Sequence, residues 1–191
     1  MPMENNVRVI YEPHDLQSIQ RYRDDTILRQ LRPKTISADT LTRLPNYRIS
    51  ETLALYENGE IQATCEISYT ADARIEARND LYEIDRFDAS HPKRVAVLSN
   101  LVVYPDTHSA FSRFLTHIHI RLLERNVEVT LVACADEAIE AFADLGFRHY
   151  RGRAYDNEMG WINPLVLFNN DKVHLARVGS ALASMHLISH T

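Results

Sequence analysis

The chain has 191 residues, of which 45% are hydrophobic and 25% charged, with a formal net charge of −5 at pH 7. These proportions are those of an ordinary globular protein, and we expect one domain over residues 1–191, with a core at 7–180 and a tail at 181–191. The negative net charge argues against a protein devoted to nucleic-acid binding. No apolar run approaches the roughly 20 residues that cross a bilayer, and residues 1–6 lack the basic and apolar regions of a secretory signal.

The first half of the chain predicts a strand, a helix and a hairpin. Residues 7–11 form a short β-type run, and apolar residues then recur at helical spacing from Pro13 until Pro33. The polar stretch 34–50 is predicted to be a loop or a broken helix. Two alternating runs follow, at 51–56 and 60–69, and the Asn58-Gly59 pair between them is a strong hairpin signal.

The second half alternates strands and helices. A short helix and loop are expected at 70–93, and the later elements are a strand at 94–104, a polar turn at 105–109, an amphipathic helix, a strand at 127–134, a helix from 136 that ends at Gly146, strands at 147–151 and 161–168, and a helix at 171–178. A hairpin followed by this alternation predicts a mixed sheet with helices on its faces.

The cysteines and histidines indicate a reducing compartment and no metal. Cys65 and Cys134 each lie in an apolar, strand-like run, which favours buried free thiols and a cytoplasmic protein. His117 and His119 are two residues apart on a predicted helix and so point to different faces. No Cys/His group has the spacing of a structural zinc site.

Two local patterns resemble the GNAT superfamily of N-acetyltransferases. Leu101–Asp106 is similar to the apolar strand and Pro-Asp pair that lead into the family's cofactor turn, and Ala141–Arg148 is similar to its Leu-Gly-Phe helix end. The resemblance covers residues 7–180. It implies an α/β (α+β) fold with a mixed, mostly antiparallel central sheet and helices on both faces.

Three further segments are similar to one branch of this superfamily, the N-acyl amino acid synthases and acyl-homoserine lactone synthases. They are Leu81–Phe87, Val97–Leu101 and Pro164–Phe168. The chain departs from the signalling synthases at Val97 and Asn100, where they carry Glu and Arg, and this argues against acyl-homoserine lactone formation itself.

The resemblance implies an N-acyltransferase that moves an acyl group from acyl-CoA or acyl-carrier protein to a small amine or amino acid. Leu101, Val102 and Val103 would pair with the donor's pantetheine arm like an added strand. The pyrophosphate would lie at the following turn and helix start, formed by Thr107, His108, Ser109, Ala110, Phe111, Ser112 and Arg113. Backbone amides and a helix dipole suit an anion there, although Thr107 or Ser109 can equally be a plain N-cap.

The usual glycines are missing from this turn, which predicts a donor site of different shape, one suited to a carrier protein. The loss also supports an alternative, a catalytically inactive GNAT-fold module that binds an acyl ligand or a protein partner. The retained strand, turn and helix favour the enzyme, and we expect that function. The locally basic stretch 29–48 is either a solvated face or a docking surface for an acidic carrier protein.

Acyl transfer also needs a base and an acid. Glu66, on the polar face of the second hairpin strand, is our candidate base; Asp136 is an alternative base or a helix N-cap. Tyr104 and Tyr150 are candidate acids, or else core residues. Ser99 and Asn100 are polar within an apolar strand, so each needs a partner, and we expect them to contact substrate.

Overall fold

The computed structural model describes residues 6–30, 50–72, 75, 79–103, 108–156 and 160–187. Its strands are β1 (Asn6–Ile10), β2 (Glu51–Glu57), β3 (Glu60–Tyr69), β4 (Val95–Val103), β5 (Val129–Cys134), β6 (Arg148–His149), β7 (Ala154–Asp156) and β8 (Gly160–Phe168). Its helices are α1 (Pro13–Gln30), α3 (Asn79–Tyr82), α4 (Ile84–Ser90), α5 (His108–Glu124), α6 (Ile139–Asp144) and α7 (Lys172–Arg177), with 3₁₀ helices η1 (Asp136–Ala138) and η2 (Ala181–Leu187).

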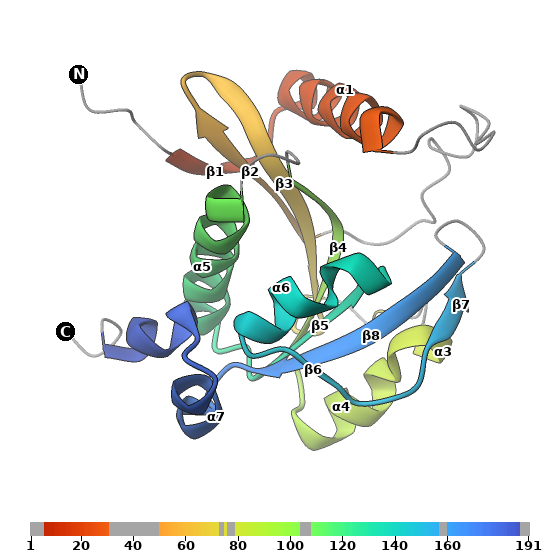
Figure 1. Ribbon diagram of the computed structural model, residues 1–191, viewed down its shortest axis with the longest axis vertical. Coiled ribbons are helices and arrows are strands. Elements are labelled where there is room, and N and C mark those ends of the chain that lie inside the picture. The colour runs from red at the N-terminus through yellow and green to blue at the C-terminus, as the bar shows by residue number, and fades with distance from the viewer. Residues whose placement is uncertain are drawn as a thin grey trace.

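The strands form an 8-stranded sheet in the order β1-β2-β3-β4-β5-β8-β6, with β7 paired to β8. Within the described residues β4 and β5 are the one parallel pair, and the other pairs are antiparallel. Helices lie on both sides of this sheet (Figure 1). The predicted mixed, mostly antiparallel sheet is therefore confirmed.

One face of the sheet packs against α5, α6, α7 and η2. Alternation in β3 directs Cys65 and Ile67 to this face, where they join the buried stripe of α5. That stripe is the one expected from the helical spacing, with buried residues Phe114, Leu115, Ile118 and Leu122. The largest apolar cluster thus fastens α5 to the sheet.

The opposite face is covered by α1 over β2 and β3, and by α3 and α4 over the strands near β8. Ile19 of α1 packs on Ala54, and Ile84 of α4 packs with Val97 and Ile162. Glu66 lies between Cys65 and Ile67 in β3, so it points to this second face.

Two turns depend on left-handed backbone conformations. Asn58 and Gly59 have φ values of 54° and 83°, as a two-residue type I′ turn requires, so the hairpin prediction is confirmed. Gly146 follows α6 with φ of 98°, and a Cβ there would lie 2.6 Å from the Leu175 side chain. Only glycine fits that position without a shift in α7.

Two segments differ from the sequence-based prediction, and a third lies largely outside the described residues. The strand β7 was not predicted, and residues 181–187, expected to be tail, form η2 with Leu182 buried in the core. Nearly all of the loop or broken helix expected at 34–50, and most of the basic stretch 29–48, fall outside the described residues. No helix in the described ranges is long and apolar enough to cross a membrane.

Candidate active site

The two central strands part halfway along β4. Pairing with β5 runs from Val95↔Val129 to Val97↔Leu131 and then stops, although β4 continues to Val103. Strand β5 stays with β8 as far as its last residue, Cys134. We call the separated ends, residues 98–103 of β4 and 132–134 of β5, the strand fork. Figure 1 shows β3 and β4 diverging from β8 at this level.

A β-bulge in β4 lies within the fork. Glu66 pairs with Ser99, but Thr64 pairs with Val102, so two steps along β3 match three along β4. Asn100 occupies the extra position with a left-handed φ of 48°, a conformation that Asn tolerates better than most residues. A bulge bends its strand and increases the local twist, which directs the end of β4 away from β5.

Beside the bulge, Glu66 is the centre of a buried polar group that we call the Glu66 network. Its Oε1 accepts from Nη1 of Arg23 in α1, and its Oε2 accepts from Nδ2 of Asn100 at 2.6 Å. The Nε of Arg23 donates to Oγ1 of Thr64 at 3.0 Å. Glu66 and Arg23 are each 5% exposed. The structure thus brings Glu66 and Asn100, two predicted site residues, into direct contact.

Ser99 and Cys65 complete the surroundings of the bulge. Ser99 is the register partner of Glu66, and its carbonyl accepts a hydrogen bond from the Cys65 thiol at 3.7 Å. Burial raises the pKa of the Cys65 thiol to about 12, which leaves it protonated and unreactive at neutral pH. Cys65 is therefore a packing residue behind the bulge.

The helix start of α5 lies close to elements on both sides of the fork. It follows β4 in the chain, and Phe111 stacks edge-on against Phe142 of α6, with ring centroids 5.2 Å apart. Ala110 is buried and Ser109 is exposed. Thr107 and Tyr104 are outside the described residues, and of His108 only its place in the helix is described.

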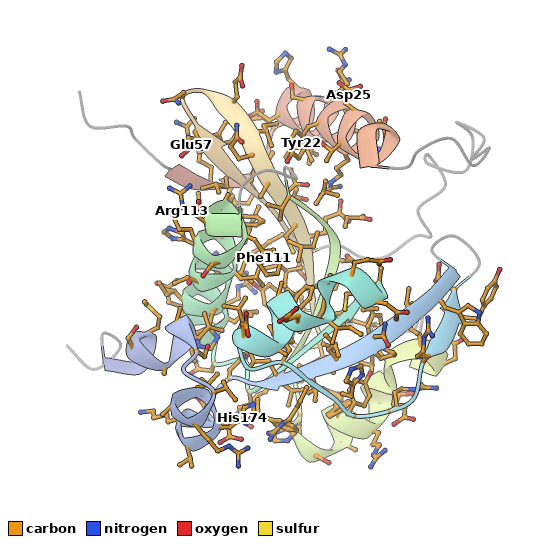
Figure 2. All side chains as sticks on the ribbon, viewed as in Figure 1. Tyr22, Asp25, Glu57, Phe111, Arg113 and His174 are labelled. Carbon is orange, nitrogen blue, oxygen red and sulfur yellow. The ribbon has the colours of Figure 1, made fainter. Side chains whose placement is uncertain are left out.

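Arg113 of this helix points to the β2–β3 hairpin. Its Nη2 donates to Oε1 of Glu57 at 3.3 Å. Figure 2 shows the two side chains side by side, with Tyr22 of α1 across the hairpin. Because Glu57 partly neutralises this guanidinium and occupies one of its donors, Arg113 should bind a phosphate more weakly than an unpaired arginine would.

Tyr150 lies on the other side of the fork, next to β6. Its hydroxyl donates to the carbonyl of Tyr82 at 2.9 Å, and its ring stacks edge-on against Phe87 at 5.1 Å. Burial raises the pKa of the Tyr150 hydroxyl above its ordinary value. Tyr150 therefore contacts α3 and α4, whereas Glu66 contacts α1, so the structure does not bring these two predicted catalytic residues into contact.

Asp136 follows the end of β5 and is not a helix cap. The N-cap of η1 is Ala135, without a side-chain hydrogen bond, so the cap interpretation is wrong. The Asp136 carboxylate instead accepts from Asn163 at 2.7 Å and from Arg153 at 2.9 Å. These bonds hold the carboxylate at the β5 side of the fork.

Arg23 is not among the site residues predicted from the sequence, although the sequence carries a signal for it. Ile19, Arg23 and Thr26 are buried on one face of α1, at the i, i+4, i+7 spacing of a helix stripe. A charged residue on an otherwise buried stripe needs a partner, and that requirement points to a buried carboxylate elsewhere in the chain.

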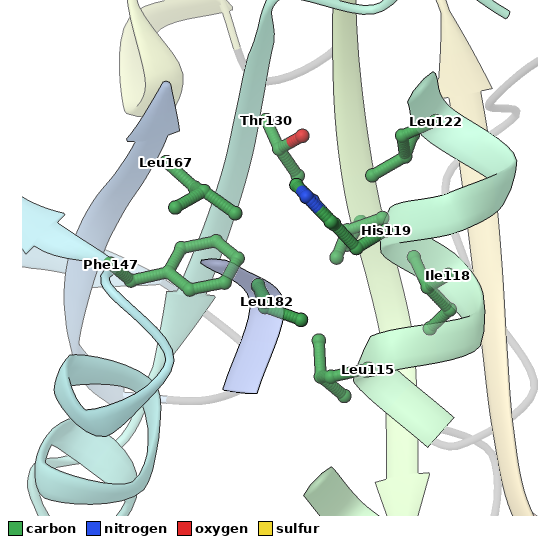
Figure 3. Close-up of a pocket in the computed structure, with 9 residues that line it drawn as sticks. Leu115, Ile118, His119, Leu122, Thr130, Phe147, Leu167 and Leu182 are labelled. Atoms are coloured by element: carbon green, nitrogen blue, oxygen red, sulfur yellow. The ribbon is translucent and has the colours of Figure 1, made fainter. Parts of the chain in front are cut away.

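A separate pocket lies between α5 and the sheet, on the face opposite Glu66. Figure 3 shows its lining, which is mostly apolar side chains such as Leu115 and Leu182, with His119 and Thr130 among them. Leu98, the first residue of the fork in β4, also lines it. Within the described ranges, no three His, Cys, Asp or Glu side chains gather as a metal site would require.

Neither a protein-family model nor a curated protein sequence matches the chain. Its fold is nonetheless that of the GNAT-like acyltransferases. It is similar to FeeM, an N-acyl amino acid synthase from uncultured soil microbes, with a TM-score of 0.73 at 15% identity over 95% of this chain and 98% of FeeM.

Two other solved structures support the same fold class. BjaI, a CoA-dependent acyl-homoserine lactone synthase, has a TM-score of 0.63 at 12% identity, over 96% of this chain and 99% of BjaI. A probable acetyltransferase from Staphylococcus epidermidis has a TM-score of 0.57 at 19% identity, over 86% of this chain and 98% of its own. At these identities the likeness establishes the fold.

Proposed function

We propose that the protein is an N-acyltransferase that moves an acyl group from acyl-CoA or acyl-carrier protein to a small amine or amino acid. The observation that carries the proposal is the strand fork, where β4 runs on to Val103 after its pairing with β5 has ended at Val97. An extended, amide-containing donor arm can pair, as an added strand does, with the part of β4 that no longer pairs with β5. Solved proteins of similar fold include an N-acyl amino acid synthase and acyl-homoserine lactone synthases.

In this proposal the backbone of Leu101–Val103 orients the thioester. Those of its N–H groups that point toward β5 rather than β3 would stabilise the oxyanion that forms when the amine nitrogen attacks the thioester carbon. The helix start at Thr107–Arg113 would hold the donor's phosphate through backbone amides. Because Arg113 is engaged with Glu57, we assign that contact to the amides and the helix dipole.

Glu66 is the proposed base. Within the Glu66 network each carboxylate oxygen accepts one hydrogen bond, and these two bonds use about half of the lone-pair positions of an ionised carboxylate. The remaining positions can accept the proton that the amine loses as the new C–N bond forms and the C–S bond breaks. Ser99 and Asn100 would contact the acceptor amine.

The departing thiolate takes a proton from a tyrosine in this scheme. Tyr150 already donates to the Tyr82 carbonyl, whereas Tyr104 directly follows Val103 of the donor edge in the chain. We therefore favour Tyr104 as the acid. The free, buried thiols of Cys65 and Cys134 fit a reducing compartment, and we extend the proposal to a cytoplasmic location.

Thermal unfolding with a panel of donors tests the proposal. Acetyl-CoA, long-chain acyl-CoA and acyl-carrier protein are compared with free CoA and unacylated carrier protein as matched controls. A true donor at about 100 times its dissociation constant stabilises the fold by about 2.7 kcal/mol, and thiol release follows when amines are added. The absence of a shift with every thioester would contradict the proposal.

A second candidate is a binding module without turnover. The glycine-free turn and the pairing of Arg113 with Glu57 favour it, because both weaken a phosphate site. Stabilisation by a thioester with no thiol release across a broad panel of amines and amino acids would select this function over the enzyme.

A further inference from the structure

The burial of Arg23 is not explained by a contribution to the stability of the fold. Its guanidinium is buried by α1 and β3, and of its three nitrogens Nε binds Thr64 and Nη1 binds Glu66. The third, Nη2, is buried and has no hydrogen-bond partner within the described part of the chain. A buried donor left without a partner costs about 1–3 kcal/mol, and a buried ion pair is often no more stable than apolar side chains of similar volume.

The contacts of Arg23 lead directly to the bulge. Arg23 fixes one oxygen of Glu66, and the other oxygen accepts from the amide of Asn100 at 2.6 Å. Asn100 is the residue with left-handed backbone at which the β3–β4 register shifts. Arg23 and Asn100 are thus joined through a single carboxylate, although they are distant in the sequence.

We propose that Arg23 is a positioning residue of the acyl-transfer site, which acts through Glu66 to hold Asn100 and thereby fixes the bulge from which β4 leaves β5. The effect of Arg23 on turnover presupposes the proposed acyltransferase function, whereas its effect on the bulge does not. It assigns to α1 the task of setting the direction of the donor edge at Leu101–Val103, and it explains why a desolvated guanidinium is kept beside the fork.

A double-mutant cycle in the turnover rate tests the link. Arg23→Lys keeps the charge but lacks the planar, rigid fork with which the guanidinium binds Thr64 and Glu66 at the same time, and Asn100→Gly keeps the left-handed backbone but removes the amide. We expect each variant to lower kcat, per folded molecule, by about tenfold. For Arg23→Lys, which changes a residue that touches no substrate in this scheme, the KM for the amine should stay within about twofold of the wild-type value. The double variant should lose no more than the worse single variant, because both act through Glu66.

Arg121→Lys is the matched control, since Arg121 of α5 also binds a buried carboxylate, that of Glu51, on the other face of the sheet. Its kcat should stay within about twofold of wild type, and its effect should multiply with that of Asn100→Gly. Wild-type kcat in folded Arg23→Lys, or losses that multiply between Arg23→Lys and Asn100→Gly, would overturn the positioning role.

Amide hydrogen exchange provides a readout that does not depend on turnover. Arg23→Lys should speed exchange at residues 100–103 relative to 95–97, and Arg121→Lys should not. If wild-type protein shows no acyl transfer but exchange responds in this way, the proposed function fails and the structural link stands. If wild-type protein is active and exchange at 100–103 is unchanged in Arg23→Lys, the positioning inference alone fails.

Discussion

Two buried glutamates on one hairpin have opposite surroundings. Glu51 in β2 and Glu66 in β3 are each 5% exposed, and both bind arginine. Glu51 faces α5, where it accepts from Arg121 at 2.9 and 3.1 Å and from Tyr69 at 3.2 Å, and it pairs with Arg125 at 2.8 Å. Glu66 faces α1, where Arg23, the arginine that it binds within the described residues, is buried with it.

The exposure of the arginines separates the two sites. The side chains of Arg121 and Arg125 are 34% and 35% exposed, so water still solvates them while they fasten α5 to β2. At Glu66 both charges are desolvated, a nitrogen of Arg23 is unpartnered within the described residues, and the strand bulge is adjacent. We infer that the Glu51 cluster stabilises the fold and that the Glu66 network serves the site.

The largest expected effect is on stability after removal of one carboxylate. Glu66→Leu leaves a buried guanidinium without a counter-ion, and we expect a loss of about 3–5 kcal/mol. Glu51→Leu leaves arginines that can turn to water, and we expect about 1–2 kcal/mol. Urea unfolding measures both. A larger loss of stability for Glu51→Leu than for Glu66→Leu would contradict the inferred difference between the two glutamate sites.

The second prediction separates stability from activity at the bulge. Asn100→Ala must hold an alanine at a φ of 48°, which costs about 1–2 kcal/mol, whereas Asn100→Gly avoids that strain. Both lose the amide, so both should lose turnover to a similar extent. Enzyme assays and denaturant midpoints check this.

Asn58→Ala is the matched control for that strain, because Asn58 has a φ of 54° in the β2–β3 turn, away from the fork. It should lose stability by a similar amount and keep wild-type turnover per folded molecule. Equal activity of Asn100→Gly and wild type would show that the side-chain amide of Asn100 has no role in turnover.

The third prediction is that the contribution of Glu51 to the stability of the fold is lost at low pH. Burial alone would raise the pKa of Glu51, but the hydrogen bond from Arg121 and the charges of Arg121 and Arg125 outweigh it and hold the pKa below its ordinary value of 4.5. A carboxylate with a lowered pKa stabilises the fold above its unfolded-state pKa, and the contribution is lost as pH falls through the folded-state value. Glu51→Gln should therefore be less stable than wild type at neutral pH.

The stability difference between wild type and Glu51→Gln should shrink as pH falls below about 4.5. Urea midpoints measured at several pH values show it. A difference that stays constant down to the acid limit would mean that Glu51 is not held ionised by its arginines.

The smallest expected effect is local opening, reported by the two thiols. Burial raises the pKa of Cys65 to about 12 and that of Cys134 to about 11, so native protein should react slowly with iodoacetamide. Arg23→Lys should speed labelling of Cys65, which lies behind the bulge, and Glu51→Gln should not. Mass spectrometry of the labelled peptides resolves the two sites.

Local signals predicted much of the fold. The Asn58-Gly59 pair specifies the hairpin, the apolar spacing specifies α5, and Gly146 ends α6 as expected, because each depends on neighbours in the sequence. By contrast β7 has three residues and no alternation to detect, and it forms because β8 offers an edge for pairing.

The geometry of the site is less visible in the sequence. Glu66 and Asn100 could be chosen as polar residues in apolar strands, but their contact joins residues 34 apart, and Arg23 meets Glu66 across 43 residues. A bulge is a property of strand register, which the sequence of one strand does not determine. The side of the fork on which Tyr150 lies depends on β6 and β8 in the same way.

We propose that the donor occupies the strand fork, and hydrogen exchange with a bound acyl thioester tests this placement most directly. Residues 98–103 of β4 should exchange more slowly with the bound thioester than in the protein without ligand, while residues 95–97, already paired with β5, should be unchanged. Protection that appears elsewhere and leaves residues 98–103 untouched would contradict the claim.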